Sequence, residues 1–160
     1  MMTYLSKLTK AIGVKLPYFV LLTLSCSASD EVITYDFKLA NISNIESTFL
    51  NIMNQQLVHE VKPDVFACNL MRGHSSYMIE KGVVSHDNYP DRYIWLTERG
   101  GHNVSEIVAY GYSTPQTAFE AFMNSDEHKH IFTQYFDLCG ISIMADQNNN
   151  YYYSIIFIKL

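Results

Sequence analysis

The chain has 160 residues, of which 48% are hydrophobic, 14% aromatic and 17% charged. This length suits one globular domain, and the hydrophobic content excludes a wholly disordered chain. The formal net charge is −5, from 11 basic and 16 acidic residues, and the sequence has no run of lysine or arginine. It therefore predicts no nucleic-acid partner, because phosphate binding depends on gathered basic side chains.

The first 29 residues are typical of a secretory signal. Their only charges are Lys7, Lys10 and Lys15, which precede an apolar stretch over residues 16–26. That stretch is shorter than the roughly 20 residues needed to span a bilayer. A basic start, a short apolar segment and small residues behind it indicate a signal peptide. An amphipathic anchoring helix is the alternative, but no polar face accompanies the apolar one.

Two processing events fit this segment. Residues 22–26, Leu-Thr-Leu-Ser-Cys, resemble a bacterial lipoprotein box, in which Cys26 would carry a lipid and attach the protein to a membrane. Alternatively, Ser27 and Ser29 would let a signal peptidase release a chain that starts near Asp30. Either event removes three lysines and leaves eight basic against 16 acidic residues. We therefore expect an acidic protein that is extracellular or held in the cell envelope.

Cys68 and Cys139 are the remaining cysteines if Cys26 is lipidated or removed. An oxidising compartment would permit a disulfide between them. Both lie in predicted core elements, however, where free cysteine packs as a small hydrophobic residue. Two isolated cysteines form neither a zinc motif nor a disulfide framework. Two buried thiols are therefore the favoured interpretation, and a bridge is the alternative.

The first half of the exported chain predicts one strand and two helices. Residues 32–39 alternate between apolar and polar side chains, as a strand does. A capping-box spacing at residues 43–46 then opens a helix that continues to about residue 56. A second helix is predicted from Val65 to Lys81, and Gly82 is placed to end it in a left-handed conformation.

The second half begins with an irregular, polar and aromatic segment over residues 83–101. A strand follows over residues 105–109, and Thr114-Pro115 opens a third helix with an N-cap and a proline at the first helical position. Ser125 restarts a short fourth helix, which has acidic residues 126–127 in its first turn, where the helix dipole favours them.

Two long strands, over residues 138–145 and 151–160, complete the chain. The last strand is apolar on both faces, so it needs cover on both sides. With four helices available, the sequence predicts the α/β class, as a three-layer α/β/α sandwich around a small, mostly antiparallel sheet. One domain would cover residues 43–160, after a lead-in over residues 30–42.

His86, Glu106 and His128 are the candidate site residues, because they lie at predicted element ends, where side chains converge on one cleft. Two imidazoles and a carboxylate suit a zinc site with an open position or a general acid–base pair. His128 cannot share one ion with His130, because side chains two apart on a helix point about 200° apart. A packing role is predicted for His74. No nucleophile elbow, zinc-protease helix, phosphate loop or dinucleotide motif is present.

Four segments, in the right order, resemble motifs of bacterial CAP-domain proteins. This is the superfamily of cysteine-rich secretory proteins, antigen 5 and pathogenesis-related proteins, which contain the SCP-like extracellular domain. The segments are Ala67-x6-His74-Ser75-x-x-Met78 with the following Ser85-His86, then Ser105 to Gly111, Ala121 to Lys129, and Phe136 to Ile141.

The resemblance implies an α/β/α sandwich and a cleft formed by two histidines and two acidic residues. Carried onto this chain, the histidines are His86 and His128, and one acid is Glu106. Ser125 stands at the position of the second acid, where an N-cap role is a sufficient structural explanation. Ile107 replaces the usual asparagine. We expect Glu106 to accept a hydrogen bond that fixes one imidazole.

CAP-like domains are associated with secreted roles in binding lipids, sterols, metals or partner proteins. The resemblance thus implies an exported, non-enzymatic binding domain that takes a small apolar ligand, a lipid or an envelope protein. The alternative is a weak metal-assisted hydrolase using His86, Glu106 and His128, and a third interpretation is a structural envelope protein without a ligand. No cofactor is required. His86 and His128 would hold a divalent ion such as zinc only weakly, because catalytic zinc sites have three protein ligands.

Overall fold

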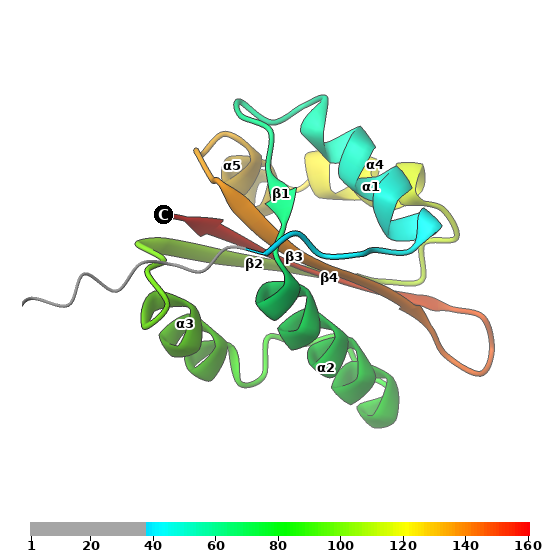
Figure 1. The fold of residues 1–160 in the computed structure, drawn as a ribbon. Coiled ribbons are helices and arrows are strands. Elements are labelled where there is room, and N and C mark those ends of the chain that lie inside the picture. Colours follow the sequence, from blue (N-terminus) through cyan, green and yellow to red (C-terminus); the bar gives the residue numbers. More distant parts are fainter. Residues whose placement is uncertain (1–37) are drawn as a thin grey trace, which may run out of the picture. The chain divides into compact units, whose positions relative to one another are not determined.

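The computed structural model describes residues 38–160, so the predicted signal, Cys26 and most of the strand predicted over residues 32–39 lie outside the described part. Figure 1 shows how the elements are arranged. In chain order they are α1 (Asn44–Asn54), β1 (Lys62–Pro63), α2 (Val65–Lys81), α3 (Tyr89–Thr97), β2 (Asn103–Tyr110), α4 (Pro115–Met123), α5 (Asp126–Phe132), β3 (Leu138–Ala145) and β4 (Tyr151–Lys159).

A four-stranded sheet with the order β1-β3-β4-β2 lies at the centre of this domain. β4 pairs antiparallel with both β3 and β2, and β1 pairs parallel with β3. The sheet is thus mostly antiparallel, as predicted. β2 is longer at both ends than the strand expected over residues 105–109, and the short β1 was not expected.

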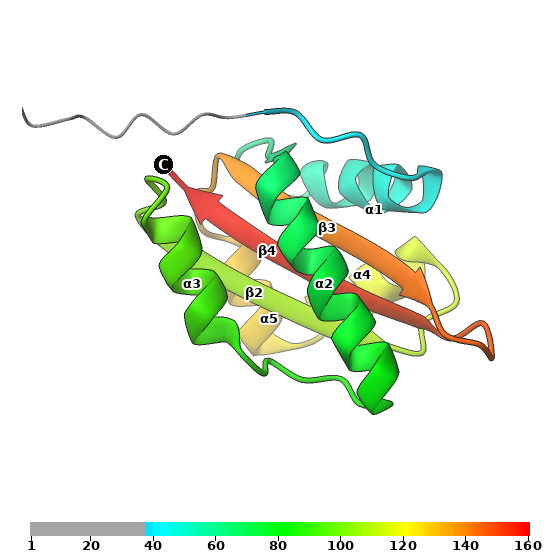
Figure 2. The same cartoon turned by 60° about the horizontal axis from the view of Figure 1, so that its bottom comes forward.

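Helices cover both faces of the sheet. α2 and α3 lie side by side on one face, and α1, α4 and α5 cover the other (Figures 1 and 2). β4 supplies alternate residues to the two cores: Tyr153, Ile155 and Phe157 belong to one buried cluster, and Ile156 and Ile158 to the other. The α/β/α sandwich predicted from this doubly apolar strand is therefore confirmed.

The predicted helix starts are present in α1, α2 and α4. Ser43 and Glu46 form a complete capping box at α1, and Thr114 caps α4 in front of a proline. The Asp64 carboxylate accepts from the Ala67 N–H at the start of α2. α2 ends at Gly82, whose φ of 66° is a left-handed conformation that glycine adopts at little cost.

The segment over residues 83–101 was predicted to be irregular. That prediction is wrong in part, because the segment contains α3. This helix begins after Asn88, which has a left-handed backbone and makes no side-chain capping bond, and it has Pro90 in its first turn. Only Arg92 and Leu96 of the helix are buried. Such a narrow buried face, one residue of which is charged, does not produce the apolar periodicity by which helices are recognised.

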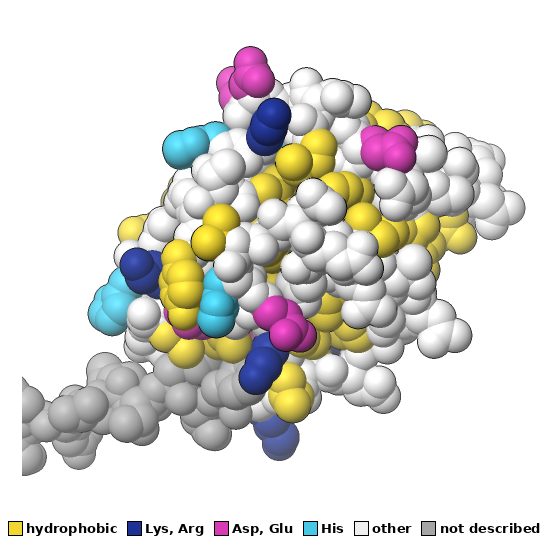
Figure 3. Space-filling view, turned by 90° about the horizontal axis from the view of Figure 1, so that it is seen from above, with side chains coloured by type: hydrophobic (Ala, Val, Ile, Leu, Met, Phe, Trp, Pro, Cys, Tyr) yellow, Lys and Arg dark blue, Asp and Glu magenta, His cyan; other side chains and the backbone are white. Residues whose placement is uncertain are grey.

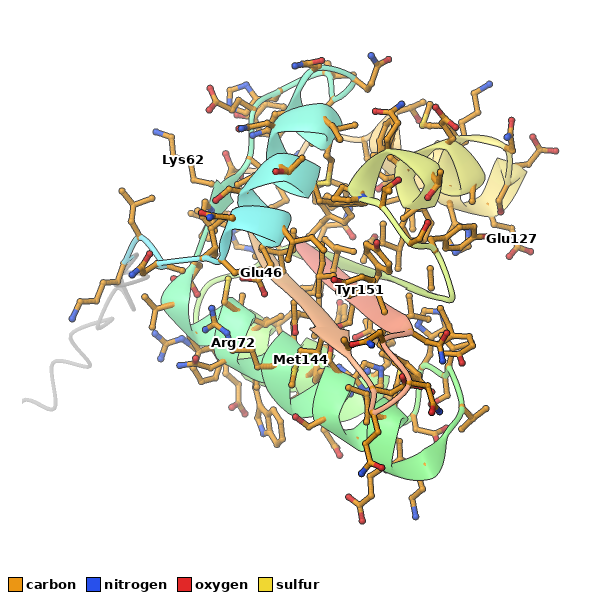
Figure 4. The ribbon with its side chains drawn as sticks, turned by 90° about the vertical axis from the view of Figure 1, so that its right-hand side faces the viewer. Glu46, Lys62, Arg72, Glu127, Met144 and Tyr151 are labelled. Atoms are coloured by element: carbon orange, nitrogen blue, oxygen red, sulfur yellow. The ribbon has the colours of Figure 1, made fainter. Side chains whose placement is uncertain are left out.

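The outer edge of β3 is protected by side chains where β1 ends. β1 pairs with only the first two residues of β3. Beyond it, the N–H of Ile141 donates to the Cys68 Sγ at 3.4 Å, and the N–H of Ile143 donates to the Glu46 Oε1 at 3.2 Å. Figure 4 shows Glu46 at the start of α1, next to β3. Covered edges of this kind do not recruit other strands.

Cys68 and Cys139 are both buried free thiols, as favoured above. Burial raises the pKa of each thiol above its ordinary value. Both groups are therefore protonated and unreactive at neutral pH, because the thiolate is the nucleophilic form.

The surface gives no sign of a charged interface on the face seen in Figure 3. There, acidic and basic side chains of the described residues are scattered among hydrophobic and uncharged polar ones. Within residues 38–160, no helix has both the length and the apolar character needed to cross a membrane.

Candidate functional site

A buried ion pair between Glu106 of β2 and Arg92 of α3 forms the centre of the site. Arg92 Nε donates to Glu106 Oε2 at 2.7 Å, and Arg92 Nη2 donates to Glu106 Oε1 at 2.8 Å. The two side chains are only 6% and 1% exposed. This two-pronged geometry is the strongest form of arginine–carboxylate pairing, and it fixes the orientation of both groups.

His86 attaches to the outer side of this pair. Its Nδ1 lies 2.9 Å from Glu106 Oε1, and its side chain is 52% exposed. Because a carboxylate only accepts hydrogen bonds, Nδ1 is the donor, which leaves Nε2 available to a ligand. Glu106 thus orients this imidazole in the manner of the carboxylates that hold histidines in binding sites.

Glu106 is a permanent anion at neutral pH. Burial raises the pKa of this carboxyl group, but the hydrogen bonds from His86 and Arg92 and the charge of Arg92 outweigh that effect. The net result is a pKa below the ordinary value. The carboxylate therefore acts as a fixed acceptor rather than as a group that exchanges protons near pH 7.

His74 of α2 is buried against the same carboxylate. Its Nε2 lies 2.8 Å from the Ser85 carbonyl oxygen and 3.9 Å from Glu106 Oε1. A carbonyl oxygen only accepts, so Nε2 is the donor. Burial and then the charge of Arg92 lower the pKa of His74, which keeps this imidazole neutral.

His128 and Ser125 line a pocket around the free edge of β2, the last strand of the sheet. The pocket has a volume of about 360 Å³. The ring of His128 packs edge-on against Phe122, with 5.1 Å between ring centroids. Burial, and then the charge of His86, lowers the pKa of His128. The remaining lining residues are apolar or aromatic: Val84, Val108, Ala109, Tyr110, Tyr112 and Ala121.

The four residues singled out from the sequence thus occupy two adjoining places. His86 and Glu106 are hydrogen bonded to each other, whereas Ser125 and His128 line the pocket beside them. Ser125 has the extended backbone of an N-cap residue, but its hydroxyl makes no capping hydrogen bond. The prediction that this side chain caps the helix is therefore wrong. The Ser125 side chain lines the pocket instead.

Sequence reasoning missed Arg92 and assigned His74 to packing alone. Arg92 reaches Glu106 across 14 residues of chain, and His74 across 32, so no local spacing links them. The available signal for Arg92 was the Asn88-Tyr89-Pro90 start of a helix, which puts an arginine one turn inside a helix directly behind His86.

The described residues do not fit a tight zinc site. Residues 38–160 contain no group of three or more histidine, cysteine, aspartate or glutamate side chains that could hold a metal ion. His86 and His128 would supply two nitrogens, one ligand fewer than catalytic zinc sites have. In addition, Glu106 is already engaged by Arg92 and His86.

No protein-family model matches the sequence, and no curated protein matches it. Three solved structures are similar to about three quarters of this chain. An outer surface protein of Borrelia burgdorferi matches with a TM-score of 0.65 and 16% identity, over 77% of this chain and 98% of that one. An extracellular protein of Bacillus anthracis that contains an SCP domain matches with a TM-score of 0.60 and 18% identity, over 76% of this chain and 45% of that one.

The domain has a CAP-like fold. A cysteine-rich secretory protein of Staphylococcus aureus also matches, with a TM-score of 0.57 and 18% identity over 73% of this chain and 39% of its own. The CAP-like domain thus spans less than half of the two longer chains, those of Bacillus anthracis and Staphylococcus aureus. The fold resemblance stated from the four motifs is confirmed.

Proposed function

We propose that this CAP-like domain is an exported, non-enzymatic binding protein of the cell envelope, and that it takes a small apolar ligand, such as a lipid chain, beside His128. The observation that carries the proposal is the lining of the 360 Å³ pocket. Seven of its nine lining residues are apolar or aromatic. Pockets for small ligands combine such walls with a few polar groups that orient the ligand, a part that Ser125 and His128 would play here.

The state of Glu106 supports binding rather than hydrolysis. A general base must have a pKa near the working pH and a free oxygen toward its substrate. Glu106 has a lowered pKa, and both its oxygens accept hydrogen bonds from Arg92 or His86. It therefore serves to hold the His86 imidazole in one orientation.

Two observations support export. The first is the order of basic, apolar and small residues before Asp30, which is that of a signal peptide. The second is that the three similar structures are described as outer surface, extracellular and secretory proteins. An envelope location would give the domain access to membrane lipids or to other envelope proteins.

Oleic acid is a suitable probe of the pocket, with binding measured by calorimetry on the domain from residue 30 onward. We expect Ala121→Phe to abolish binding, because the added ring occupies the pocket. Glu120→Phe, which adds the same ring one position away at an exposed site outside the lining, should bind as the unmodified protein does. Equal binding by all three proteins, with matching circular dichroism spectra, would place the ligand elsewhere and refute the proposal.

A further inference from the structure

A second cavity lies between α2 and α3, and Arg92 of the Glu106 pair is one of its lining residues. Figure 2 shows these two helices next to each other over one face of the sheet. The cavity has a volume of about 250 Å³. Cavities for drug-sized ligands have roughly 300–1,000 Å³, so this one suits a single small ring. None of its lining residues is shared with the pocket beside His128.

Two aromatic side chains line the cavity. Trp95 of α3 lines it while remaining 47% exposed, although tryptophan is usually buried in a domain of this kind. Tyr77 of α2 lines it as well, and its hydroxyl is held by Asp87 at 2.7 Å. Aromatic rings of this kind combine an apolar face with a polar edge, so they favour ligands that are partly apolar and partly hydrogen bonding.

Uncharged hydrogen-bonding groups surround these rings. Asn88 lines the cavity, and its side chain makes no capping bond to α3. Asn69 accepts from Arg72 through its amide oxygen, which leaves its NH₂ group as a donor. His74 also lines the cavity, and since its Nε2 donates to Ser85, the neutral ring has Nδ1 as an acceptor. Donors and an acceptor therefore meet in one small space.

The cavity has no free charge among the described residues that line it. Arg92 is the only permanently charged lining residue, and its guanidinium is committed to Glu106 and to the Asp87 carbonyl oxygen. A phosphate or carboxylate would find no unpaired cation there, and a cationic ligand would find no unpaired carboxylate. The lining thus favours a neutral ligand.

We propose that this cavity binds one ring of a neutral saccharide. A pyranose has an apolar C–H face, which would pack on Trp95, and a rim of hydroxyl groups, which would pair with Asn69, Asn88 and His74. A neutral pyranose ring therefore matches all three features of the lining: the aromatic surface, the amide groups and the lack of free charge. The site is independent of the apolar pocket in the proposed function, so either can be correct without the other.

Trp95 is the single tryptophan of the sequence and reports directly on this cavity. Maltotriose, cellotriose and N,N′,N″-triacetylchitotriose, each neutral and titrated to millimolar concentration, are the probes. We expect at least one to change the intensity or wavelength of tryptophan fluorescence in a saturable way. Failure of all three to do so would overturn the proposal.

Gly73→Leu tests whether that binding occurs in the cavity. Gly73 lines it, and a Cβ added there meets nothing within 4 Å, so leucine would fill the space without disturbing the helix. We expect a thermal unfolding temperature at least equal to that of the unmodified protein, and loss of saccharide binding. Binding that persists in a folded Gly73→Leu variant would overturn the proposal.

Trp95→Ala and Tyr93→Ala form a matched pair, measured by calorimetry. Tyr93 is a similarly exposed aromatic residue of α3, at 40%, but does not line the cavity. Trp95→Ala should weaken binding by about tenfold or more, the equivalent of roughly 1.4 kcal/mol. Tyr93→Ala should leave the affinity unchanged. Equal affinities for the two variants would refute the role of Trp95.

Discussion

At the scale of single residues, the buried Arg92–Glu106 ion pair is expected to contribute to the stability of the domain. Arg92→Ala would leave a buried carboxylate with His86 as its main partner. Removing one member of a buried pair typically costs about 3–5 kcal/mol, because the remaining charge is left uncompensated. We expect a loss of that size in the free energy of unfolding, measured by urea denaturation.

A double variant is the control for this loss. Arg92→Met combined with Glu106→Leu removes both charges and keeps side chains of substantial volume. Hydrophobic replacement of a whole buried pair is often neutral or stabilising. The double variant should therefore be more stable than Arg92→Ala alone, and a double variant that is less stable would contradict the assignment of the loss to an unpaired charge.

The same carboxylate makes stability depend on pH. The pKa of Glu106 is lower in the folded protein than its ordinary value of 4.5, so the unfolded chain binds the proton more readily. This contribution is fully present above about pH 4.5 and is lost as the pH falls through the folded pKa. Glu106→Gln should therefore flatten the stability profile below about pH 4.5, as measured by denaturation across pH. An unchanged acid limb would refute this role.

Zinc binding is expected to depend on His128 but not on His130, the two histidines of α5. His128 lines the pocket beside His86, whereas His130 is exposed on another side of the helix. Calorimetry should detect only weak zinc binding, increasing with pH because ligating imidazoles must be neutral. His128→Ala should abolish it and His130→Ala should leave it nearly unchanged. An equal loss in both variants would mean that the wrong histidine was chosen.

The residues of the site were predictable only in part, because some of them meet partners that are far away in the sequence. His86, Glu106 and His128 were singled out because they lie at predicted element ends, and they also lie in segments that resemble motifs of CAP-domain proteins. Arg92 was missed because a buried arginine has the same sequence appearance as an exposed one. The burial of Arg92 depends on its ion pair with Glu106, which lies 14 residues away in another element.

At the scale of elements, close packing of α2 on β3 depends on Gly140. A Cβ built there would clash with the Ala67 carbonyl group, which is part of the backbone and cannot move aside as a side chain can. Gly140→Ala should therefore cost about 1–3 kcal/mol or more, as overpacking does. Gly73→Ala is the matched control, since it meets no atom and removes a helix-interior glycine worth about 0.8–1 kcal/mol. Thermal melting should give a lower unfolding temperature than that of the unmodified protein for Gly140→Ala and a higher one for Gly73→Ala.

Elements with strong local signals were predicted closely, and those held by distant contacts were not. The capping box of α1 and the glycine that ends α2 depend on neighbours within a few residues. β1 is different, since its two residues form a strand only because they pair with Leu138 and Cys139, far along the chain. α3 has the same dependence, because its buried residues pack on β2 rather than forming a periodic apolar face.

At the scale of the whole molecule, β4 links fold and function. Its two apolar faces require helices on both sides, and the resulting layers leave β2 at an edge. At that edge α3 brings Arg92 to Glu106, and α5 brings His128 into the pocket lined by residues of β2. The layer architecture could be inferred from composition and alternation, whereas the meeting of these side chains required the sheet order.

Export concerns the whole chain, and it predicts which covalent form of the protein a cell contains. If residues 1–29 are a signal, a bacterial host should yield an envelope protein that begins at a diacylglyceryl-modified Cys26 or near Asp30. Intact mass spectrometry separates these two forms by their N-terminal residue and by the mass of the lipid. Cys26→Ser should abolish the lipidated form, while cleavage near Asp30 would continue. Recovery of intact Met1 from the envelope fraction would refute both processing events, because the three lysines that either event removes would still be present.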